Sequence, residues 1–174
     1  MRDTGRVLPT PFAEISSQSM VASSHILWAE LWLGIATDAF DRARAFVRAV
    51  AARDPEAAGA GGVKLSHLLS ELSLLRAQVQ QGRAQYVEAA EHDPASLATM
   101  AWAVRMNTLK IAASEGAPRV CQGALAVCGI MGYKNDTPFS VSRHLRDTLS
   151  ASLMVTNDRL HRTNAGLLLV AKDV

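Results

Sequence analysis

Two histidine–carboxylate pairs have the spacing that could place a metal ion on one face of a helix. They are His67 with Glu71 and Glu88 with His92, each separated by four residues. Residues four apart are neighbours on a helix surface. Such pairs arise readily by chance, however, and helical bundles with paired metals carry two Glu-x-x-His units. The sequence contains no such unit, and we expect no metal site.

Two thiols are the other groups with possible chemistry. Cys121 and Cys128 lie seven residues apart on one apolar stretch. On a helix that spacing separates them by about 10.5 Å, which is too far for a disulfide. We expect both to be small core residues rather than reactive thiols. A Gly-x-Ser-x-Gly motif is absent, so no hydrolase nucleophile is indicated. The sequence places His25, His144 and His161 at the surface or in helix packing.

The elements that position these residues are predicted to be helices. Aromatic residues make up only 5% of the 174, and 49% are apolar. Apolar residues recur three and four apart, which is typical of amphipathic helices. The prediction is an all-α fold, an up-down bundle of four to six helices. Residues 1–22 are predicted to be an extended lead-in and residues 23–174 the helical bundle domain.

Proline, glycine and capping residues predict where each helix begins and ends. The first should begin after Ser23 or Ser24, bury a stripe that includes Leu27 and Leu31, and end before a glycine-rich loop at residues 54–62. The later helices are expected at residues 65–91, at 94–128 with a kink at Pro118, at 137–151 and at 157–171, with a loop at 129–136.

Charge and segment lengths exclude several classes of protein. The 18 basic and 16 acidic side chains leave a formal charge of +2, and they are interspersed. This charge distribution produces no electrostatic field that would attract nucleic acid or an anionic membrane. No apolar run approaches 18 residues, and the first 19 residues have no secretory apolar region. We expect a soluble, cytoplasmic domain.

One set of motifs is more specific. Cys128-Gly-Ile-Met-Gly-Tyr133 is followed by Pro138, by Arg143-His-Leu-Arg-Asp147 and by Asn157-Asp-Arg-Leu-His-Arg162. This order and spacing resemble the end of the acyl-CoA dehydrogenase family, with its Gly-Gly-x-Gly-Tyr loop, proline-started helix, Arg-Asp pair and closing arginine. Leu33-Gly-Ile-Ala36 is similar to the turn of that family's first C-terminal helix. The likeness covers about residues 22 to 171.

The resemblance implies a helical domain that forms one wall of a flavin site. In the family, FAD lies between this domain and a middle β-domain, and a neighbouring subunit contributes to the dinucleotide end. A carboxylate removes the α-proton of an acyl thioester while hydride passes to the flavin, and hydrogen bonds stabilise the thioester oxygen. The expected cofactor is FAD. The expected partners are further copies of this chain, or a subunit that supplies the β-domain, and an acyl thioester.

The catalytic positions implied by the resemblance are changed here. The family's glutamate falls on Val155, and the alternative base of some members falls on Ser24. Neither side chain can accept a proton as a carboxylate does. The backbone amide of Val155 could still polarise a carbonyl. Asp158 is the nearest carboxylate and the remaining catalytic candidate, although its place at the start of the last helix favours capping that helix or complementing its dipole over catalysis.

The cofactor positions are also reduced. Ala126 stands where the family has a glutamine, and Ile130 replaces the second glycine of the loop. Gly129, Gly132 and Asn157 are what the resemblance leaves for contact with the flavin. The hypothesis is therefore a C-terminal helical domain or small subunit of an acyl-CoA dehydrogenase-like oxidoreductase, incomplete or inactive alone. A flavin monooxygenase of the same fold and a non-enzymatic assembly module are the alternatives.

Overall fold

The computed structural model describes residues 9–56 and 58–171, and this part of the chain folds as α-helices with no strand. The predicted all-α class is therefore confirmed. The elements are, in chain order, α1 Phe12–Ile15, a π-helical stretch Ser16–Met20, α2 Val21–Ala51, α3 Ala58–His92, a 3-10 helix Pro94–Ala98, α4 Met100–Cys128, α5 Ile130–Tyr133, α6 Ser142–Leu149 and α7 Asn157–Leu168.

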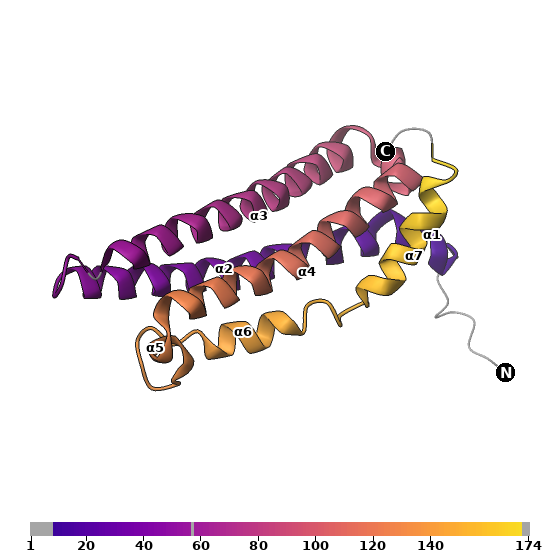
Figure 1. Ribbon diagram of the computed structural model, residues 1–174. Helices are drawn as coiled ribbons and strands as arrows, with labels where there is room; N and C mark the ends of the chain where they lie inside the picture. The colour runs from indigo at the N-terminus through magenta and orange to yellow at the C-terminus, as the bar shows by residue number, and fades with distance from the viewer. Residues whose placement is uncertain (1–8, 57, 172–174) are drawn as a thin grey trace.

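Three long helices, α2, α3 and α4, run antiparallel along the length of the molecule (Figure 1). The last two helices, α6 and α7, lie against α4 on the side away from α3. Short connections join neighbouring antiparallel helices, as in an up-down bundle. The single turn α5 sits at one end of α4, whereas α7 lies toward the other end. Helix α4 therefore contacts every other long element.

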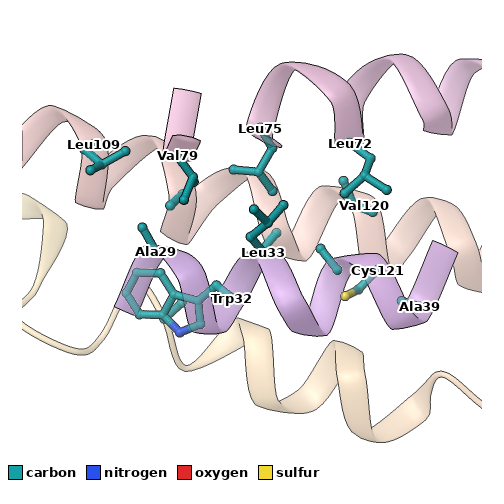
Figure 2. Close-up of a cluster of buried hydrophobic side chains, with 14 of the residues drawn as sticks. Ala29, Trp32, Leu33, Ala39, Leu72, Leu75, Val79, Leu109, Val120 and Cys121 are labelled. Carbon is teal, nitrogen blue, oxygen red and sulfur yellow. The ribbon is translucent and has the colours of Figure 1, made fainter. Parts of the chain in front are cut away.

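The core forms where the three long helices meet (Figure 2). Leu72, Leu75 and Val79 of α3 point from one side toward α4 and α2, and all three are buried. Leu68 belongs to the same stripe, so the predicted apolar face of this helix is confirmed for those four positions. Burial of each such side chain stabilises the fold by roughly 1.5–3 kcal/mol.

The closest helix pair is built from small residues. Helices α2 and α4 share the most extensive contact in the structure. The fully buried alanines of α2 are Ala29, Ala36, Ala39 and Ala43, and those of α4 are Ala113, Ala117 and Ala124. Small side chains let the two helix axes approach closely, and larger side chains of α2, including Trp32, Leu33 and Phe40, are buried in the same core. Leu27 and Leu31 are 68% and 59% exposed, so the predicted stripe of α2 was wrong at these two positions.

The first helix starts earlier than its capping residues predicted. Residues 1–8 of the predicted lead-in lie outside the described residues, but from Phe12 onward the chain is helical rather than extended. Pro11 precedes the first turn, where a missing amide is tolerated. Ser17 and Ser19 donate their hydroxyls to the carbonyls of Glu14 and Ile15, so the serines are accommodated within the helical turns.

Other boundaries also differ. The predicted loop around Gly59–Gly62 is wrong, because these glycines form the first turn of α3. The helix predicted at 137–151 is shorter, since α6 begins only at Ser142. The amide of Val141 donates to the carbonyl of Gly132, which holds the preceding residues in a turn. Helix α4 continues across Pro118 as predicted. Within the described residues, no helix has the length and apolar character needed to cross a membrane.

Candidate functional site

A buried lysine lies at the centre of the region where the resemblance places the catalytic residues. Lys110 of α4 is fully buried, and its ammonium group donates to the carbonyl of Ala151 at 3.1 Å and to that of Val155 at 3.0 Å. It also donates to Oδ1 of Asn157 at 2.8 Å. Its Nζ atom lies 5.6 Å from the ring centroid of Trp32. A buried charge needs such partners to be tolerated.

Asn157 is the second member of this cluster, and both polar atoms of its side-chain amide form hydrogen bonds within it. Its Oδ1 accepts from Lys110, and its Nδ2 donates to Oγ of Ser114 and to Oε1 of Glu115, both at 3.1 Å. Asn157 is only 9% exposed. The sequence predicted Asn157 as a flavin contact, but its amide is used inside the chain, where it fixes the start of α7 on α4.

Val155 has an unusual backbone conformation. Its φ is 44°, and it is the single non-glycine residue with a positive φ in the described part of the chain. For a β-branched residue this is a genuine outlier. Its side chain is 38% exposed, while its carbonyl points inward to Lys110. None of the described residues accepts a hydrogen bond from its amide. The amide that the sequence singled out is therefore not engaged by any residue in 9–56 or 58–171.

The candidate acids and bases are dispersed. Asp158 is exposed in the first turn of α7, where its negative charge interacts favourably with the helix dipole. Ser24 is half-buried, and its hydroxyl donates to the carbonyl of Val21. Glu115 is an exposed carboxylate tied to Asn157, and the sequence analysis did not single it out.

The glycines of the predicted cofactor loop have different roles. Gly129 has a φ of 57° and open space where a Cβ would lie, so it ends α4 and faces outward. Gly132 is buried, and a Cβ there would lie 2.7 Å from Cβ of Cys128. Ile130 and Tyr133 are 63% and 68% exposed. The segment is thus at the surface, although Gly132 itself serves packing.

The two parts of the predicted site lie far apart. Lys110 and Gly129 are 19 residues apart on α4, which corresponds to about 28 Å along the helix axis. Figure 1 shows α5 and the start of α7 at separate places along α4. Gly129 and Asn157 of one copy therefore cannot converge on one ring system.

A polar stripe on α4 is what the sequence analysis missed. Asn107, Lys110 and Ser114 are all buried and face α7 and the segment before it. Nδ2 of Asn107 donates to Oδ1 of Asn164 at 2.8 Å, so α7 is held on α4 at its start and again in its second half. The signal was present: polar residues at a spacing of three and four interrupt an apolar helix, which marks a single face.

Burial changes the titration of groups near Lys110. Desolvation, followed by the charge of Lys110, lowers the pKa of His25 on α2 to about 4. Desolvation also lowers the pKa of Lys110, against the effect of Glu115. His25 is 4% exposed and its Nε2 has no partner among the described residues. His25 is therefore expected to be neutral at pH 7, beside a cation.

The two thiols and the histidine pairs have the following environments. Cys121 and Cys128 are buried, as predicted, and desolvation raises the pKa of each to about 11. Nε2 of His92 lies 3.8 Å from Oε1 of Glu88 on an exposed surface. In the part of the chain that the structure describes, no group of three or more potential metal ligands occurs.

Comparison with known protein families agrees with the fold and with the spacing of these motifs. The sequence model described as "Acyl-CoA dehydrogenase, C-terminal domain" matches residues 17–164. This covers most of the chain, from the π-helical stretch to the second half of α7. The chain belongs to the acyl-CoA dehydrogenase family, of which it is a C-terminal helical domain. A comparison with curated proteins gives no match.

Proteins of this family generally use FAD, so the residues must be tested for their fit to a flavin. Asn157 has no free donor or acceptor facing outward, and Gly132 is closed by Cys128. Gly129 has open space and the amide of Val155 has no acceptor among the described residues, but Gly129 ends α4 whereas Val155 lies against Lys110, 19 residues earlier on that helix. The residues of one copy of this chain do not fit a flavin by themselves.

Proposed function

We propose that this chain is the helical component of an acyl-CoA dehydrogenase-like oxidoreductase and that it does not dehydrogenate acyl thioesters alone. The observation that carries the proposal is the segment Ala151–Asn157, which has the family's position but no carboxylate at Val155. Loss of a general base typically lowers a rate by about 10²- to 10⁴-fold. A cofactor-binding β-domain would come from a longer polypeptide or from another subunit.

The separation of the two open positions supports an oligomer. Gly129 and Val155 are both exposed, and Lys110, which binds the carbonyl of Val155, lies about 28 Å from Gly129 along α4. In an assembly of several copies, each position would lie against a different cofactor. The exposed side chains of Ile130 and Tyr133 next to Gly129 would then be covered by the neighbouring copy. A homo-oligomer is thus part of the proposal.

The test uses the purified 174-residue chain. We expect a colourless protein that gives no heat on titration with FAD and no acyl-CoA-dependent reduction of an electron acceptor. A complete acyl-CoA dehydrogenase is the positive control for both assays. A chain that purifies with bound flavin and is bleached by an acyl-CoA would contradict the proposal.

A second candidate is a flavin-dependent monooxygenase of the same fold, which Val155 favours because this chemistry needs no carboxylate base. The two are distinguished by supplying the assembled protein with reduced flavin and oxygen. Formation of an oxygenated substrate supports the monooxygenase. Transfer of hydrogen from an acyl thioester to the flavin supports the dehydrogenase.

A third candidate is an assembly module without catalysis, which the close, alanine-lined contact of α2 and α4 favours. Size-exclusion chromatography with light scattering, read together with flavin absorbance, distinguishes it. Oligomers that never take up flavin, even with a β-domain partner present, support the module. A monomer under all conditions argues against every version of the proposed assembly.

A further inference from the structure

The conformation of Val155 requires something to hold it. A β-branched residue at φ 44° is strained. Such a conformation persists only where the surroundings determine it. The segment from Ala151 to Thr156 is a series of turns between α6 and α7, without the regular hydrogen bonds of a helix. Its backbone hydrogen bonds run from the amides of Leu153 and Met154 to the carbonyl of Ser150 and from the amide of Asn157 to the carbonyl of Ser152, and none of them uses the amide or the carbonyl of Val155.

Lys110 contacts this segment at both ends and at the strained residue itself. It donates to the carbonyl of Ala151 before the turn, to that of Val155, and to Oδ1 of Asn157 after it. An ammonium group has three donors and no acceptor, so these contacts use all of its hydrogens. Hydrogen bonds to a charged group are about twice as strong as neutral ones.

The surroundings leave the ammonium group no better alternative. Lys110 is fully buried, and Trp32 packs 5.6 Å from its Nζ atom. A buried charge that lost these acceptors would be destabilised by several kcal/mol. Lys110 and the carbonyl of Val155 therefore hold each other in place.

We propose that Lys110 is the positioning residue of the segment Ala151–Asn157: its ammonium group holds Val155 in the left-handed conformation by drawing the Val155 carbonyl inward. With the carbonyl inward, the Val155 side chain stays partly exposed, as do Leu153 at 72% and Met154 at 47%. The functional consequence, that position 155 is presented to a substrate carbonyl, rests on the proposed function. The positioning itself does not.

The first experiment measures amide hydrogen exchange in residues 152–157 of the full chain. We expect Lys110→Met to accelerate exchange there by about 10- to 100-fold, as for loss of hydrogen bonds to a charged group. The control Lys64→Met removes an exposed lysine of α3 and should leave these amides unchanged. Equal exchange in Lys110→Met and the unaltered chain would overturn the proposal.

A second variant separates positioning from general support of the fold. Glycine adopts a positive φ without strain, so in a Val155→Gly background the segment needs less restraint. In that background, the acceleration of exchange caused by Lys110→Met should be several-fold smaller than the acceleration it causes in the chain that retains Val155. If the two substitutions act independently, Lys110 supports the fold without fixing this conformation, and the proposal fails.

Because Lys110→Met places the fold itself at risk, a third measurement uses the unaltered chain. With ¹⁵N-labelled lysine and ¹³C-labelled carbonyls, we expect one ammonium signal in slow exchange with water, with couplings to the carbonyl carbons of Ala151 and Val155. Lys110→Arg assigns the signal by removing it. Absence of those couplings would overturn the proposal. None of these readouts involves flavin, so a failed cofactor test would leave the result standing.

Discussion

Nε2 of His144 on α6 lies 2.6 Å from Oδ2 of Asp38 on α2, although 106 residues separate them. The same carboxylate oxygen accepts from Nε of Arg42 at 2.8 Å. Nη1 of Arg42 in turn donates to the carbonyl of Ser140 at 3.0 Å. Asp38 and Arg42 thus fasten the segment that leads into α6 to the middle of α2.

The substitution Asp38→Asn should loosen α6 while leaving the three long helices folded. Burial raises the pKa of Asp38, but the hydrogen bonds from Arg42 and His144 outweigh it and hold that pKa below its usual value. The carboxylate therefore stabilises the fold above pH 4 and ceases to do so as the pH falls through the lowered pKa. Asp38 is 55% exposed, so we expect a loss of about 1 kcal/mol or less in urea unfolding at pH 7.

Asp41→Asn is the matched control for this change. Asp41 pairs with Arg44 on the same helix and does not reach α6. Amide exchange in α6 should rise in Asp38→Asn and stay at its original rate in Asp41→Asn. Equal rates in the two variants would contradict the tie between α2 and α6.

His25 should make the stability depend on pH between about 4 and 6.5. Its pKa in the folded chain is about 4, against a usual value of 6.5, because burial and the charge of Lys110 disfavour the imidazolium. The unfolded chain binds more protons in this range, so stability is full above pH 6.5 and falls as the pH is lowered. The loss between pH 7 and pH 4 from this group is about 3 kcal/mol.

The measurement is urea unfolding at pH 7 and at pH 4.5 in His25→Leu and in His161→Leu. His161 is exposed on α7, so its substitution leaves the buried surroundings of His25 unchanged. His25→Leu should lose most of the difference in stability between the two pH values. His161→Leu should retain that difference. A pH dependence that survives His25→Leu would show that another group is responsible.

Gly132→Ala should destabilise the fold, because the new Cβ would lie 2.7 Å from Cβ of Cys128, an atom fixed to the backbone of α4. We expect a loss of about 1–3 kcal/mol, as for other overpacked positions. Gly166→Ala on the exposed side of α7 has open space and should gain about 0.5–1 kcal/mol from helix propensity. Thermal unfolding of both variants distinguishes them. A stable Gly132→Ala would mean that α5 moves freely relative to α4.

Cys121 and Cys128 should not react with a thiol reagent in the folded chain. Both are buried, and burial raises the pKa of each thiol to about 11, so little thiolate exists at pH 7. We expect labelling of two thiols only after unfolding in urea. Rapid labelling of the native chain would show that the end of α4 near Gly129 opens.

The helices themselves could be predicted from sequence, because the apolar spacing in α3 and around Leu109 to Val120 in α4 has the helical period. Boundaries were less predictable. The glycines at 59–62 favoured a loop, yet they form a helical turn, and at Gly61 an added Cβ would lie 3.3 Å from the side chain of Val47 on α2. In α2, Leu33 and four fully buried alanines face the core, whereas Leu27 and Leu31 face solvent. A hydrophobicity pattern alone cannot distinguish a close contact of small residues from a wider one of large residues.

The sequence located candidate site residues, whose role stays a prediction, but it did not predict the buried contacts around them. The order and spacing of the motifs led to Val155 and Asn157, because they depend only on the chain. Lys110 was not found, since a lysine is almost never fully buried without partners, and its partners are two backbone carbonyls and a side chain 41 to 47 residues away. Because every residue carries a backbone carbonyl, the sequence does not reveal which carbonyls bind the lysine.

The length of α4 between Lys110 and Gly129 has a consequence for genetics. Under the proposed assembly, a substitution near Gly129 in one copy and a substitution near Val155 in another copy would impair different cofactor sites. Two inactive alleles, one altered at each place, would then restore some function when expressed together, since a fraction of the cofactor sites would be formed by two unaltered surfaces.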